Sequence, residues 1–139
     1  IQGAGAVQKS IIEAFPLADI RIAIVWINML QGDSEERAQK AAQKFTDARV
    51  TQFYDPEKHT GQKIAASIGW DHKVAWDIYL FYSAGSVWDE NPPDPTAWMH
   101  QLKDDWADQD HFRTGDDLAA ELKHTLMKLK NMSAAGVAF

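Results

Sequence analysis

The chain has 139 residues, of which 45% are hydrophobic and 24% are charged, a composition typical of one folded domain. Its 14 basic and 20 acidic side chains give a formal net charge of −6, which excludes nucleic acid and anionic membrane surfaces as expected partners. No apolar run approaches the roughly 20 residues of a membrane span. Because the chain has no cysteine, it cannot by itself form a disulfide or carry a thiolate nucleophile.

The first half of the chain predicts helices that alternate with strands. Apolar residues recur at helical spacing ahead of Pro16, and a run of β-branched residues follows. In chain order we expect a helix through Phe15, a strand over Ile20–Ile27, a helix capped by Asp33 with Glu36, a strand over Arg49–Tyr54, and a helix from Asp55-Pro56 to Gly69.

The second half predicts a β-hairpin followed by helices. We expect a strand over Val74–Tyr82, a turn at Ala84-Gly85 and a strand around Val87-Trp88. A short helix from Asp94 through Leu102 and an exposed loop over Lys103–Arg113 follow. The closing helix is capped by Thr114 and Asp117, and its inward residues are Leu118, Leu122, Leu126 and Leu129. Residues 1–132 are then one soluble α/β domain with a mixed sheet between helical layers, and residues 133–139 are a tail.

This order of elements resembles the thioredoxin-like superfamily, in its redoxin and TlpA-like branch. The chain looks closer still to a bacterial group of thioredoxin-like proteins. The residues that carry this likeness are Val25-Trp26 with Met29-Leu30, Gln52-Phe53-Tyr54-Asp55-Pro56, Ala75-Trp76-Asp77-Ile78-Tyr79-Leu80 and Trp98-Met99-His100-Gln101-Leu102. The resemblance implies a three-layer α/β/α sandwich.

In such proteins a Cys-x-x-Cys pair comes just before the first helix, and Gly3 to Gln8 looks like the continuation of such a pair. The resemblance therefore implies that the dithiol and the strand before it lie upstream of Ile1. The alternative is that the chain descends from a redoxin that gave up the chemistry. The family's cis-proline is also missing, because the matching stretch is His72-Lys73-Val74-Ala75.

Four residues are candidates for supporting roles in a redox site: Asp77, Val74, Trp76 and Trp26. Strand alternation puts Asp77 on the face of Ala75 and Tyr79, where a carboxylate is partly desolvated. It is either a proton shuttle for a buried sulfur or a structural residue bonded to its neighbours. The tryptophans Trp26, Trp76, Trp88, Trp98 and Trp106 either line a pocket or, as we favour, pack in the core.

The five histidines show no metal-binding spacing, and His72 and His100 are only weak candidates for metal ligands. We expect no cofactor. The leading hypothesis is a thiol–disulfide oxidoreductase scaffold, inactive as given, that works with a redox partner protein. The rival is a non-catalytic binding module that associates with itself or a partner through a sheet edge. The weakest hypothesis is that the protein carries a small molecule or a metal ion. Cytoplasm and periplasm both remain open as compartments.

Overall fold

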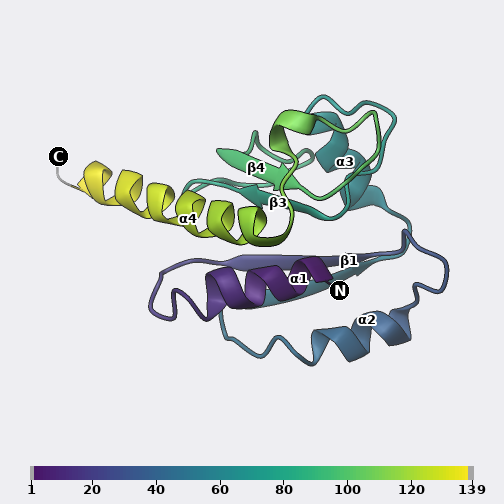
Figure 1. The fold of residues 1–139 in the computed structure, drawn as a ribbon, viewed down its shortest axis with the longest axis horizontal. Coiled ribbons are helices and arrows are strands. Elements are labelled where there is room, and N and C mark those ends of the chain that lie inside the picture. The colour runs from purple at the N-terminus through teal and green to yellow at the C-terminus, as the bar shows by residue number, and fades with distance from the viewer. Residues whose placement is uncertain (1, 138–139) are drawn as a thin grey trace.

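The computed structural model describes the backbone of residues 2–137 and the side chains of residues 3–131 (Figure 1). Helices and strands alternate through the first half, as predicted, and the protein has a mixed α/β fold. The elements are α1 (Gln2–Val7), the π-helix η1 (Gln8–Ile12), β1 (Ile22–Ile27), α2 (Glu35–Ala42), β2 (Val50–Asp55), α3 (His59–Ser67), β3 (Ile78–Phe81), β4 (Ala97–His100), the 3₁₀ turn η2 (Gln109–His111) and α4 (Gly115–Val137).

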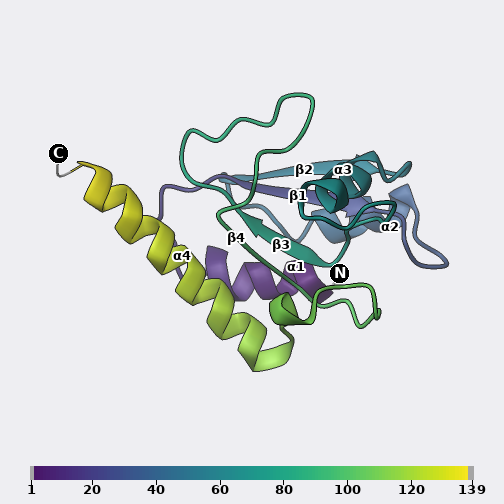
Figure 2. The ribbon, with the colours of Figure 1, turned by 90° about the horizontal axis from the view of Figure 1, so that it is seen from above.

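The strands form two separate two-stranded sheets and not the single mixed sheet that we expected. β1 pairs in parallel with β2, from Ile22 opposite Val50 to Ile27 opposite Asp55. β3 pairs antiparallel with β4. The strands follow the order β2, β1, β3, β4 in Figure 1, and Figure 2 also shows β1 between β2 and β3, so β1 and β3 are the inner pair. Within the described residues, no pairing joins these two strands.

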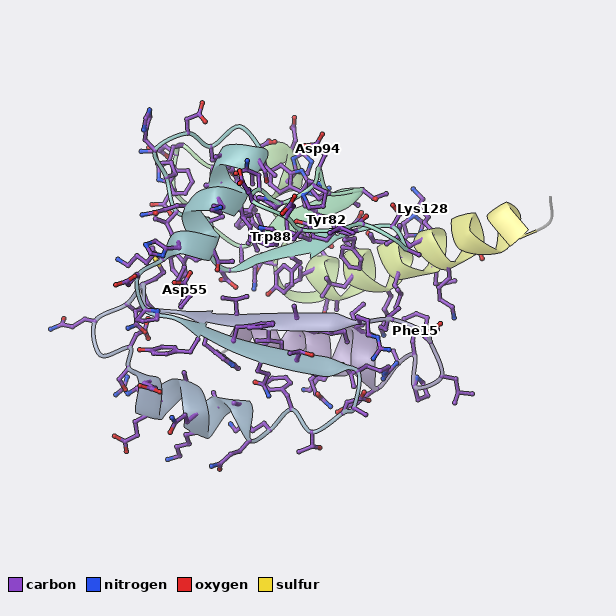
Figure 3. The ribbon with its side chains drawn as sticks, turned by 180° about the vertical axis from the view of Figure 1, so that it is seen from behind. Phe15, Asp55, Tyr82, Trp88, Asp94 and Lys128 are labelled. Carbon is purple, nitrogen blue, oxygen red and sulfur yellow. The ribbon has the colours of Figure 1, made fainter. Side chains whose placement is uncertain are left out.

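The helices α2 and α3 begin slightly later than the sequence predicts. The cap of α2 is Ser34, whose hydroxyl accepts a hydrogen bond from the Arg37 N–H at 3.3 Å. The Asp33 carboxylate instead accepts hydrogen bonds from the N–H groups of Met29 and Leu30, in the loop before it. Asp55 belongs to the end of β2, beside the start of α3 (Figure 3), and its carboxylate accepts a hydrogen bond from the Thr60 N–H at 2.7 Å. Both carboxylates still anchor the turns that lead into the helices.

The predicted hairpin at Ala84-Gly85 is wrong, and so is the short helix after Asp94. Residues 82–96 form a long loop that carries the exposed Trp88, and the partner of β3 is β4 (Figure 3). In β4, Met99 packs into one hydrophobic cluster and Trp98 packs against another. That two-sided burial requires a strand period, and the prolines that precede β4 oppose a helix.

Two hydrophobic clusters lie on opposite faces of β3 and β4. The first joins η1, β3, β4 and α4 through Ile11, Tyr79, Met99, Leu118, Leu122 and Leu126, with Ile22 of β1 packed against it. The second joins α3 to the loops beside it through Ile64, Ala65, Trp70, Ala75, Leu102 and Ala107. Ile78 and Leu80 of β3 pack against the second cluster, as the alternation of a strand requires.

The closing helix is longer than predicted, because α4 continues to Val137 through most of the expected tail. Residues 138–139 of that tail lie outside the described residues. Three of the four predicted inward leucines of α4 are buried, and Leu129 is half-buried. The expected exposed loop over Lys103–Arg113 contains a buried residue, Ala107, and the turn η2. None of the helices in the described part of the chain is both long and apolar enough to cross a membrane.

Candidate functional site

Three polar side chains meet at the start of β3 and the end of β4. Gln101 donates hydrogen bonds from its side-chain amide to the Tyr79 hydroxyl at 2.7 Å and to the Asp77 carboxylate at 3.2 Å. The Tyr79 hydroxyl lies 3.5 Å from the same carboxylate oxygen. Tyr79 is buried, whereas Asp77 and Gln101 are half-buried. We call Asp77, Tyr79 and Gln101 the polar cluster.

The first turn of α1 lies directly against the polar cluster. A Cβ atom built on Gly3 would stand 2.5 Å from the Tyr79 hydroxyl oxygen and 2.6 Å from an Asp77 carboxylate oxygen. Any side chain at position 3 would therefore have to displace these two polar atoms. The polar cluster therefore faces the N-terminal end of α1, where backbone N–H groups favour negative charge.

Backbone geometry places Asp77 in this position. The residue has a φ of 49°, in the left-handed region that aspartate enters more readily than most residues. Its carbonyl accepts a hydrogen bond from the Gln101 N–H at 3.1 Å, which extends the pairing of β3 with β4 by one residue. The predicted strand over Val74–Tyr82 is shortened here, because a strand cannot continue through a left-handed residue. The chain before Asp77 instead packs against α3.

The electrostatics of the polar cluster keep Tyr79 neutral. Burial raises the pKa of the Tyr79 phenol well above its ordinary value of 10, and the nearby Asp77 carboxylate raises this pKa further. The hydrogen bond from Gln101 opposes both effects without cancelling them. Tyr79 is therefore a hydrogen-bond donor at neutral pH. The polar cluster thus places one carboxylate, one neutral hydroxyl and one amide beside the start of α1.

The other predicted supporting residues lie apart from the polar cluster. Val74 contacts α3, since its Cγ1 atom would be 2.6 Å from a Cβ built on Gly61. Trp76 packs against the second hydrophobic cluster. Trp26 faces β2 and α2, where its indole donates a hydrogen bond to Gln52 at 3.0 Å. The tryptophans named in the sequence analysis do not line one pocket: Trp76, Trp98 and Trp106 pack against a core, and Trp88 is exposed.

The two weak metal candidates have different environments. His72 is exposed and has a positive φ of 64°. His100 is fully buried, and both ring nitrogens have partners: Nε2 donates to the Asp108 carbonyl at 2.6 Å, and Nδ1 accepts from the Leu102 N–H at 3.1 Å. No group of three or more potential metal ligands occurs among the side chains that the structure describes.

Sequence reasoning missed a second polar arrangement beside β4. The ring of His111 stacks on Trp98 with a centroid distance of 3.8 Å, and its Nδ1 atom lies 2.6 Å from the Asp108 carboxylate. Burial acts to raise the pKa of Asp108, but hydrogen bonds from the Asp110 N–H and from His111 outweigh it, so this pKa is lowered. An open cavity of about 420 Å³ adjoins this stack, with Arg113 and Glu121 on its wall. No spacing in the sequence predicts this stack.

Comparison of the chain with protein-family models, with curated proteins and with solved structures gives no match. The mixed α/β class therefore stands on the structure itself. The likeness to thioredoxin-like proteins stands only on the sequence segments and the order of elements described above.

Proposed function

We propose that this chain is the scaffold of a thioredoxin-like thiol–disulfide oxidoreductase, in a three-layer α/β/α arrangement whose dithiol is supplied ahead of α1. The observation that carries the proposal is the contact between Gly3 and the polar cluster. It puts a carboxylate and a neutral hydroxyl at the helix end where a redoxin holds its reactive cysteines. The chain alone is inactive in this chemistry, because thiol–disulfide exchange needs sulfur.

In the proposed reaction, one thiolate attacks the substrate disulfide and expels one substrate sulfur as a thiolate. The second cysteine loses its proton and attacks the resulting mixed disulfide, which releases the reduced substrate and leaves the enzyme's dithiol oxidised. Asp77 is the proposed acceptor of the proton that the second cysteine loses. Tyr79 and Gln101 position its carboxylate by the hydrogen bonds described above.

One feature of the chain departs from the family. Every peptide bond of the described residues is trans, and the residue directly before Val74 is Lys73 and not a proline. The backbone that receives substrate in a redoxin therefore has a different shape here. We infer that the substrate range of the complete protein differs from that of proline-bearing redoxins.

The proposal is tested with the protein isolated from its natural source. Intact mass and N-terminal sequencing establish whether residues with a dithiol precede Ile1, and insulin reduction measures activity. We expect a dithiol-bearing product that reduces insulin, while the 139-residue chain does not. A native product without cysteine, or a dithiol-bearing product without activity, would contradict the proposal.

The role of Asp77 has a separate test in that native protein. Asp77→Asn should slow insulin reduction at least tenfold near neutral pH, with a smaller loss at higher pH, where the second thiol ionises without help. The matched control is Asp71→Asn, since Asp71 is an exposed loop residue of the same type. Equal losses in both variants, or a loss independent of pH, would show that Asp77 is structural.

A second candidate function is a non-catalytic module that binds a partner or itself through a sheet edge. The inner edges of β1 and β3, which have no strand partner within the described part of the chain, favour this candidate, because free strand edges readily pair with another chain. Size-exclusion chromatography with light scattering provides its test. We expect association that depends on concentration for the 139-residue chain, and a strictly monomeric chain up to millimolar concentration would count against it.

A further inference from the structure

β1 is an apolar strand that lacks the burial its composition predicts. All six residues of Ile22–Ile27 are apolar and most are β-branched, which is typical of a strand with neighbours on both edges. None of the six is fully buried, and Ala23 is exposed. Its only strand partner within the described chain is β2. Within the described chain, β1 therefore has a strand partner on one edge, although its composition is typical of a strand with partners on both edges.

The free backbone groups of β1 can be assigned by residue. Ile22 donates its N–H to the carbonyl of Arg49, on the β2 side, at 3.0 Å. In a strand, alternate residues direct their N–H and C=O groups to opposite edges. Those of Ile24 and Trp26 therefore also point to β2, and those of Ala23, Val25 and Ile27 point to the inner edge.

The free backbone groups of β3 can be assigned in the same way. The Asp77 carbonyl accepts a hydrogen bond from the Gln101 N–H, and the Phe81 carbonyl accepts one from the Thr96 N–H, both on the β4 side. Alternation then directs the backbone groups of Ile78 and Leu80 to the inner edge. Among the described residues, the inner edges of β1 and β3 thus present N–H and C=O groups that have no backbone partner.

The two inner strands run in opposite directions. Ile22, at the start of β1, and Phe81, at the end of β3, pack against the same cluster. Ile27, at the end of β1, lies beside Gly61, which in turn contacts Ala75 just ahead of β3. The ribbon shows the same opposed directions (Figure 2). A strand that paired with both would run parallel to one and antiparallel to the other.

The start of α1 lies at the end of the molecule where β1 ends. Gly3 contacts Asp77, two residues after the Ala75 that adjoins Gly61 and Ile27. A segment that runs parallel to β1 would therefore finish beside the first turn of α1. A helix is the usual connection between two parallel strands, and α1 with η1 would then join the new segment to β1.

We propose that the position between β1 and β3 accepts one extended apolar segment, which runs parallel to β1, antiparallel to β3 and leads directly into α1. The segment is apolar on both faces, because η1 and α4 lie on one side and α3 on the other. It completes a five-stranded mixed sheet. This inference rests on the thioredoxin-like arrangement of the proposed function but not on its redox chemistry.

The test adds to the N-terminus an extension of about six valine and isoleucine residues, joined by a linker of about four glycine and serine residues. Amide hydrogen exchange is measured by NMR for the extended and unextended chains. The matched control carries proline at alternate positions of the extension, since proline lacks the N–H that pairing requires. Light scattering reports the oligomeric state of each.

The proposal predicts that inner-edge amides gain protection selectively. In the monomeric extended chain, exchange should slow at least about 100-fold at Ala23, Val25, Ile27, Ile78 and Leu80, and not in the proline control. Amides that are already paired, at Ile24 and Tyr79, should change much less. Equal exchange in both extended forms, or protection at the outer edges of β2 and β4, would overturn the proposal. Protection found only in a dimer would overturn the claim that the segment leads into its own α1.

If the extended chain precipitates, a second form of the test uses the unextended chain. The same apolar segment with lysines at its ends is added as a free peptide to the unextended chain. Saturable protection of the same inner-edge amides supports the proposal, and its absence at millimolar peptide overturns it. Neither outcome depends on a dithiol, so the strand and the redox proposals can fail separately.

Discussion

Gly3 of α1 lies so close to Tyr79 of β3 that a methyl group on Gly3 would stand 2.5 Å from the phenolic oxygen. This contact brings the first helix, the polar cluster and the inner strand β3 together at one end of the sheet. It also distinguishes Gly3 from Gly5 in the same helix, because a Cβ on Gly5 would meet no atom within 4 Å.

This difference makes Gly3 and Gly5 a matched pair. Alanine is favoured over glycine in a helix by up to about 1 kcal/mol. We therefore expect Gly5→Ala to raise the free energy of unfolding by about 0.5 kcal/mol. Gly3→Ala should lower it by about 1 kcal/mol or more, since the polar cluster must move. Urea denaturation of both variants measures the difference, and equal stabilisation of the two would contradict the contact.

A second close approach joins α3 to β1. A Cβ on Gly61 would stand 2.7 Å from the carbonyl oxygen of Ala75 and 2.8 Å from the Cδ1 atom of Ile27. Because backbone cannot yield as a side chain does, Gly61→Ala should lower the free energy of unfolding by about 2 kcal/mol. The neighbouring exposed Gln62→Ala should change it by less than about 0.5 kcal/mol. A Gly61→Ala variant as stable as Gln62→Ala would show that α3 packs differently.

Arg49 holds the segment after η1 against β2. Its guanidinium donates hydrogen bonds to the carbonyls of Phe15 at 2.7 Å, Ala18 at 3.2 Å and Ile12 at 3.1 Å, and its side chain is only 16% exposed. Arg49→Met should cost about 3 kcal/mol, because these carbonyls lose charged donors. The exposed Arg21→Met should be nearly neutral. Similar urea midpoints for the two variants would contradict this role.

The carboxylate of Asp47 supports Arg49, and the ion pair gives a dependence on acid pH. Hydrogen bonds from the Arg49 side chain and N–H lower the pKa of Asp47 to about 2. This contribution to stability is fully present above the unfolded pKa near 3.9 and is lost as the pH falls through about 2. We expect Asp47→Asn to remove that part of the acid dependence. An unchanged stability profile between pH 2 and 4 would contradict the pairing.

Tyr79 predicts a dependence on alkaline pH. Its pKa is raised mainly by burial, so the unfolded chain loses the phenolic proton at a lower pH than the folded chain does. The contribution is therefore complete below pH 10 and is lost as the pH rises above that value. Tyr79→Phe should flatten the fall in unfolding free energy between about pH 10 and 12. Parallel profiles for the two proteins would contradict the burial of a neutral phenol.

The sequence predicts the elements whose signals are local. The β-branched run at β1 and the leucine stripe of α4 follow directly from periodicity, and both are present in the structure. The hairpin failed because its second strand is set by packing of Trp98 and Met99 against two cores, which no local signal carries. The long loop between β3 and β4 also hides the pairing, since turn residues occur at several points along it.

The site was predictable only in part. The sequence places Asp77 near Tyr79, and their side chains lie 3.5 Å apart. Strand alternation is not the reason, because Asp77 has a positive φ and lies just before β3. The donor Gln101 comes from the end of β4, so it could not be paired with Asp77 before that strand was located. The contact with Gly3 depends on how α1 docks, which no spacing in the sequence encodes.

Amide hydrogen exchange of the unmodified chain, read residue by residue along β1, shows most directly whether the position between β1 and β3 is open. We expect an alternating pattern, with slow exchange at Ile24 and Trp26, which pair with β2, and fast exchange at Val25 and Ile27, which face the inner edge. Equally slow exchange at all four amides in the monomer would show that β1 already has a second partner, and would contradict the open position between β1 and β3.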